Sequence, residues 1–102
     1  MTLTVGDFDR IKRLGGFAMN LMVDETFLDV VKGLKEDAIR DWTNGKSPDE
    51  REAAFRDMQA IGRLQTKLKT LADNYTAEVT RLESEKKQLE RMRRQREAAE
   101  RA

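Results

Sequence analysis

The chain has 102 residues, a length that limits it to a single domain. Hydrophobic and charged residues each make up 38% of it, and so little apolar surface favours long helices over a compact globule. Because cysteine and histidine are both absent, disulfides, thiolate nucleophiles, histidine general bases and the usual zinc ligand sets are excluded.

The net charge of +1 is unevenly distributed. Residues 1–50 carry 7 Lys/Arg and 10 Asp/Glu, whereas residues 51–102 carry 13 and 9, and the segment 86–96 alone holds six basic residues and one acid. No window approaches the roughly 18 consecutive apolar residues of a membrane span, and no signal-peptide pattern opens the chain. We therefore expect a cytoplasmic protein with no membrane partner.

Residues 1–23 are predicted to form an N-terminal docking segment. Asp7 can cap a short helix, and Gly15 and Gly16 are expected to end that helix because glycine interrupts helical patterns. Phe17 opens a further apolar stretch at helical spacing. We interpret the segment as a small apolar clamp on the helices downstream; the alternative is a flexible docking peptide for a partner.

A helix is predicted from Asp24, a suitable N-cap, to Thr43. Asn44 and Gly45 should end it, since both tolerate the left-handed conformation common at helix ends. Apolar residues at steps of three or four share one face of this helix: Phe27, Val31, Leu34, Ala38 and Trp42.

The sequence "SPDE" at residues 47–50 predicts the start of a second helix. Ser47 can cap it, Pro48 suits its first position, and Glu50 can complete a capping box by accepting from the Ser47 amide. Because only a few residues separate the two helices, we expect residues 24–74 to form an antiparallel helical hairpin.

The second helix is predicted to continue into a long coiled coil, so that the fold is all-α and oligomeric. No proline follows Pro48, and a helix to about Ala99 would have about 50 residues and a length of about 75 Å. Residues 72–76 are the expected kink or break, and residues 75–102 form a coiled-coil extension with a basic end. Apolar residues recur at heptad d positions over five heptads: Ala54, Ile61, Leu68, Tyr75, Leu82 and Leu89.

Much of this apolar stripe is predicted to face another molecule. The helix from Asp24 to Thr43 spans about 30 Å and can cover only the first part of the longer helix. An exposed apolar stripe is poorly stable, so a second copy or another helical protein should bury it. The expected interface residues are Leu64, Leu68, Leu71, Tyr75, Val79, Leu82 and Leu89.

The basic segment near the C-terminus has two interpretations. The first is the solvated end of a long helix, since several glutamates lie close by. The second is a weak contact with nucleic acid through phosphate neutralisation. The residues that would make that contact are Lys86, Lys87, Arg91, Arg93, Arg94 and Arg96.

Residues 27–71 contain "FLDVVKGLKEDAIRDW", "SPDEREAAF" and "MQAIGRLQTKLKTL". This pattern resembles a loosely defined set of small helical-hairpin proteins of tailed bacteriophages, encoded among the head and packaging genes. More coarsely, it is similar to the oligomerisation core of phage small terminase subunits, although no helix-turn-helix precedes the hairpin here. The resemblance implies a virion-assembly or DNA-packaging accessory, located in the host cytoplasm or the virion.

Three functions follow from these patterns. The preferred one is a non-enzymatic helical assembly protein without a cofactor. The alternatives are a nucleic-acid-binding accessory that uses the arginine run and a coiled-coil adaptor that regulates a partner protein. No catalytic or metal-binding constellation is predicted.

Overall fold

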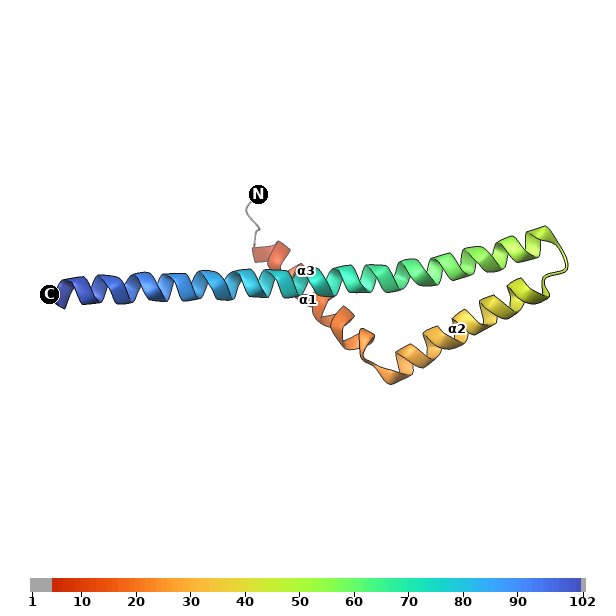
Figure 1. The fold of residues 1–102 in the computed structure, drawn as a ribbon, viewed down its shortest axis with the longest axis horizontal. Helices are drawn as coiled ribbons and strands as arrows, with labels where there is room; N and C mark the ends of the chain where they lie inside the picture. The colour runs from red at the N-terminus through yellow and green to blue at the C-terminus, as the bar shows by residue number, and fades with distance from the viewer. Residues whose placement is uncertain (1–4, 102) are drawn as a thin grey trace.

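Three helices make up residues 5–101, the part of the chain that the computed structural model describes (Figure 1): α1 (Val5–Met22), α2 (Glu25–Asn44) and α3 (Pro48–Arg101). No strand occurs among these residues, so the prediction of an all-α fold is confirmed. Residues 1–4 of the predicted docking segment and residue 102 of the predicted extension lie outside the described range.

The first helix, α1, runs without a break through Gly15 and Gly16, so the prediction that these glycines end it is wrong. Asp7 accordingly lies in the first turn of α1 and not at an N-cap. The helix continues through the two glycines because α1 approaches α3 closely at this point. A Cβ atom on Gly15 would overlap the Cβ of Tyr75 and lie 2.9 Å from the carbonyl oxygen of Leu71. Tertiary packing here outweighs the low helix propensity of glycine.

The α1 helix crosses α3 near the middle of α3 (Figure 1). Ala18 is completely buried and forms the centre of the apolar core together with Leu68 and Ala72 of α3. Small side chains on both helices let the two backbones approach closely. Phe17, by contrast, is 59% exposed and does not help to dock the segment.

The second helix, α2, begins as predicted. The Asp24 carboxylate accepts a hydrogen bond of 2.7 Å from the Phe27 N–H, which satisfies one of the free donors of the first turn. Val31 and Ala38 are buried against α3, as the predicted apolar face requires. Leu34 and Trp42, on the same predicted face, remain 49% exposed.

Residues 45–47 connect α2 to α3, and the cap on α3 differs from the prediction in one partner. The Ser47 hydroxyl accepts from the Glu50 N–H at 3.2 Å, as expected. The Glu50 carboxylate, however, accepts from the Lys46 N–H at 2.7 Å and not from the Ser47 amide. The side chain therefore satisfies a donor one residue further from the helix than in a capping box.

Gly45 ends α2 without adopting the left-handed conformation that the sequence predicted. Its φ is −59° and its ψ is 126°, which any residue can adopt. An added Cβ would lie 2.7 Å from the Arg51 Cγ and 3.1 Å from the Asp41 carbonyl oxygen, so any other residue here would force the Arg51 side chain to move. The Arg51 guanidinium also donates to the Gly45 carbonyl at 3.3 Å, which ties the turn to the first turn of α3.

The third helix, α3, is a single rod of 54 residues that sets the length of the molecule, whose longest extent is 84 Å. It continues through residues 72–76, so the expected break there is wrong. Its first half lies beside α2 and its middle beside α1, while the last third extends alone (Figure 1).

Candidate functional site

The three helices bury very little apolar surface. Four of the six buried apolar side chains are alanines, and no large side chain is fully buried among residues 6–101. The accessible surface is 8635 Å². A compact monomer of 11.8 kDa would expose roughly 5,900 Å² by the usual size scaling. The buried apolar side chains are those of Ala18, Val31, Ala38, Ala54, Leu68 and Ala72.

The residues predicted to form an interface divide into two groups. Leu68 is buried, with 5% exposure, and Leu71, Tyr75 and Val79 are half-buried. The premise that these four lack an intramolecular partner is therefore wrong, because α1 packs on this part of α3. Expecting a break at Gly15 made the first helix too short to serve as that partner.

The other predicted interface residues are exposed. Leu64 is 47% exposed, Leu82 37% and Leu89 66%, and for these three an interface role stays a prediction. Met92 was not among the predicted interface residues; it is 51% exposed and lies three residues after Leu89 on a neighbouring part of the same helix surface. We call Leu82, Leu89 and Met92 the apolar strip of the α3 end.

A groove between α2 and α3 was not predicted. Two adjoining hollows of about 350 and 360 Å³ share Asp41 and Asp57, one carboxylate from each helix. We call the combined feature the acidic groove. Its apolar lining residues are Leu34, Ala38, Ala53, Ala54, Ala60 and Ile61.

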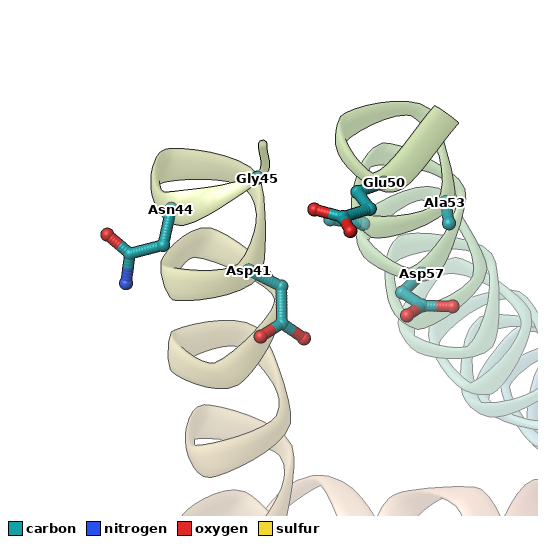
Figure 2. Close-up of a pocket in the computed structure, with 7 residues that line it drawn as sticks. Asp41, Asn44, Gly45, Glu50, Ala53 and Asp57 are labelled. Carbon is teal, nitrogen blue, oxygen red and sulfur yellow. The ribbon is translucent and has the colours of Figure 1, made fainter. Parts of the chain in front are cut away.

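Carboxylates dominate the rim of the acidic groove. Asp41 of α2 points toward α3, and Glu50 of α3 points toward α2 (Figure 2). Asp37 pairs with Arg40 of its own helix at 3.4 Å. The side-chain carboxylates of Asp41 and Asp57 have neither a hydrogen bond nor an ion pair to any of residues 5–101. The sequence signal was the spacing of Asp37 and Asp41, which places both acids beside the apolar face of α2.

The predicted nucleic-acid residues all lie exposed on the last part of α3, but they do not form one patch. Lys86 and Arg93 share a face beside the apolar strip, where Arg96 also lies. Lys87, Arg91 and Arg94 share a different face, because Arg91 follows Lys87 by four residues and Arg94 follows Arg91 by three.

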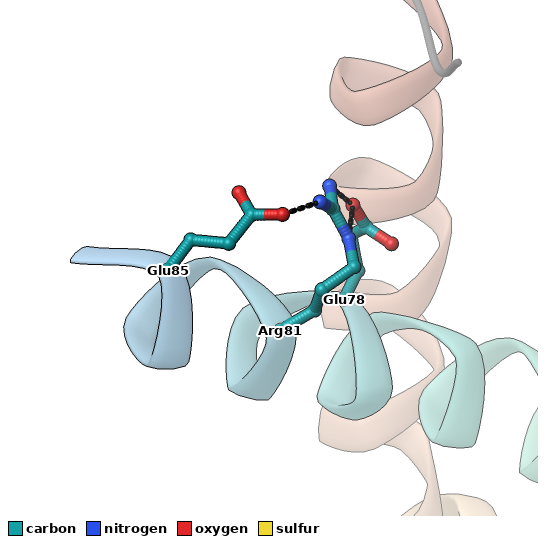
Figure 3. Close-up of polar contacts among 3 residues, drawn as sticks. All are labelled: Glu78, Arg81 and Glu85. Carbon is teal, nitrogen blue, oxygen red and sulfur yellow. Dashed lines mark hydrogen bonds and ion pairs between the residues drawn. The ribbon is translucent and has the colours of Figure 1, made fainter. Parts of the chain in front are cut away.

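Glu85 and Glu97, which lie near the arginine run, both form ion pairs within the chain. Arg81 lies between Glu78 and Glu85 and pairs with both (Figure 3). The hydrogen bonds that the Arg81 guanidinium donates to Glu78, together with the negative charges of Glu78 and Glu85, raise the pKa of Arg81. Glu97 pairs with Arg93 at 3.8 Å, with both side chains largely exposed. Because Glu85 is paired with Arg81, it offsets the arginine run less than its position in the sequence suggests.

Residues 5–101 contain neither a metal-binding cluster nor a membrane-spanning helix. No group of three or more Asp or Glu side chains is arranged to hold a metal ion. None of the described helices is sufficiently long and apolar to cross a membrane. Comparison with protein-family models, with curated proteins and with solved structures found no match to this chain.

Proposed function

We propose that this chain is a non-enzymatic helical assembly protein that associates with further copies of itself. The observation that supports the proposal is the small core: the helices leave large apolar side chains exposed on every element. Exposed apolar surface, where it is contiguous, marks contact sites with other proteins. Association would cover part of the excess surface and supply the core that a single copy lacks.

In this proposal each part of the molecule contributes to contacts within one copy or between copies. Residues 24–74 act as an antiparallel hairpin, and α1 braces the middle of α3. The end of α3 extends beyond these elements, and in the assembly it forms a coiled coil with helices of another molecule. Its surface has both requirements for such a contact, an apolar strip and many charges.

The biological setting that we propose is virion assembly or DNA packaging in a tailed phage. The support for this setting is the sequence pattern over residues 27–71, which resembles small helical-hairpin proteins of the phage head and packaging genes. A non-enzymatic role suits the chain because it has no histidine and no cysteine.

Light scattering combined with size exclusion tests self-association. Elution volume alone is insufficient, because a rod of 84 Å elutes early even as a monomer. We expect a scattering mass that is a multiple of 11.8 kDa and rises with protein concentration. A folded, helical protein whose mass stays at 11.8 kDa at every concentration would refute the proposal.

A further inference from the structure

We propose that the molecules join head to tail: the basic end of α3 in one copy lies in the acidic groove between α2 and α3 of the next copy. This inference rests on the proposed function and specifies its contact. One molecule carries both halves of the contact at opposite ends of its long axis (Figure 1).

The groove is suited to an amphipathic helix. Its interior is lined by Leu34, Ala38 and Ile61, while Asp41 and Asp57 stand at its edges without partners among residues 5–101. An amphipathic helix binds such a groove by placing its apolar side chains inward. The unpaired carboxylates favour a helix whose apolar strip is flanked by positive charges.

The end of α3 has this arrangement. Leu89 and Met92 are 66% and 51% exposed and provide the apolar strip. Lys86 and Arg93 lie along one side of the strip and Arg96 lies in line with it, so that these basic side chains can reach the carboxylates of the groove. The charges of the two surfaces are therefore complementary, and so are their apolar parts.

The groove and the basic end of one copy cannot meet each other. Asp57 and Arg93 are 36 residues apart on one uninterrupted helix, a separation of about 54 Å at 1.5 Å per residue. The basic end must therefore enter the groove of a second copy. Side-by-side pairing of two basic ends is disfavoured, because segment 86–96 carries six Lys/Arg and one Glu in each copy.

A contact between two different surfaces of identical molecules leaves one groove and one basic end free after each step. Such heterologous contacts produce closed rings or open chains. We therefore expect no defined dimer but a series of larger species. Because the contact pairs exposed opposite charges, association should weaken as salt is added.

Two charge-reversal variants of the full-length protein test the contact. The groove variant carries Asp41→Lys and Asp57→Lys, and the tail variant carries Arg93→Glu and Arg96→Glu. Each retains one functional surface. We expect each alone to be monomeric in light scattering, and an equimolar mixture to assemble again, because the unchanged tail fits the unchanged groove and the reversed tail fits the reversed groove. Circular dichroism of each variant checks that its helices are retained.

Two further variants control for charge and for folding. Asp29→Lys with Asp73→Lys makes the same change of charge at exposed positions outside the groove and should assemble like the wild type. A variant with all four groove and tail reversals exchanges the two signs and should regain assembly.

The outcomes separate the two proposals. Assembly of the groove or tail variant to wild-type size would overturn the head-to-tail contact and leave self-association intact. The head-to-tail contact would also be overturned, with self-association left intact, if the mixture stays monomeric or if the four-fold variant fails to assemble while its helicity is intact. A wild-type protein that stays monomeric but binds duplex DNA through the arginines would overturn both proposals.

Discussion

Gly15 of α1 lies directly against Tyr75 of α3, so close that a Cβ atom on Gly15 would overlap the Cβ of the tyrosine. This contact explains how a helix with two adjacent glycines docks on the middle of α3. It also places Ala18 against Leu68 and Ala72, the only buried cluster that α1 and α3 form together among residues 5–101. The stability of the α1 crossing therefore depends on the absence of a side chain at one position.

Gly15→Ala should lower stability. The methyl group meets the Tyr75 Cβ and the Leu71 carbonyl, so α1 must move away from α3, and overpacking of this kind costs about 1–3 kcal/mol. Gly16→Ala is the matched control. It meets nothing within 4 Å and should stabilise the helix by about 0.5–1 kcal/mol. Urea unfolding followed by circular dichroism gives both values, and equal effects of the two changes would contradict the crossing.

Ser47→Ala removes the hydroxyl that accepts from the Glu50 N–H and should cost about 1 kcal/mol. Glu50→Ala should also destabilise, since the Lys46 N–H loses its acceptor at 2.7 Å. Thermal melts measure both changes. The α2–α3 turn would need another explanation if neither variant melted below the wild type.

Leu68→Ala and Leu89→Ala should separate folding from assembly. Leu68 is 5% exposed, so its truncation leaves a cavity and should cost about 2–5 kcal/mol of folding stability. Leu89 is 66% exposed in one copy, and its truncation should leave the dilute monomer's melting unchanged while reducing the assembled mass. Melting curves at low concentration and light scattering at high concentration make the comparison. A lower melting temperature for Leu89→Ala in the monomer would show that the strip is already covered within the chain.

Binding to duplex DNA should be weak even at low salt, because the basic residues of segment 86–96 are spread over two faces of the helix. If they do bind phosphates, the logarithm of affinity should fall with the logarithm of salt concentration by roughly 0.9 for each contact. Changing Arg91, Arg93, Arg94 and Arg96 to Gln should then flatten that slope by about three to four. Fluorescence anisotropy over a salt series measures it. Tight, arginine-dependent binding at physiological salt would make nucleic-acid binding the leading function.

The helices and their caps were largely predictable, because their signals are local. Asp24 and Ser47 are recognised as caps by type and position, and each side chain accepts a hydrogen bond from the N–H three residues further on, that of Phe27 or Glu50. The periodic placement of Ala54, among other seam residues, also identified a face of α3 that is buried.

The failures at Gly15 and at the acidic groove depended on contacts between helices. Glycine has the same low propensity at Gly15 whether or not another helix lies against it, and only tertiary packing shows that its missing side chain is required. The acidic groove could not be predicted from the sequence for a similar reason. Asp41 and Asp57 are 16 residues apart and look like ordinary surface acids until α2 and α3 are placed side by side.

Amide hydrogen exchange along α3, measured as a function of protein concentration, tests the central claim most directly. In a single copy the last third of α3 packs against no other helix, and an isolated helix end opens and exchanges readily. If this end binds the groove of another copy, protection of residues 82–96 should rise with concentration, together with protection around Asp41 and Asp57. Rapid exchange of residues 82–96 at every concentration, up to the highest that stays in solution, would contradict the account.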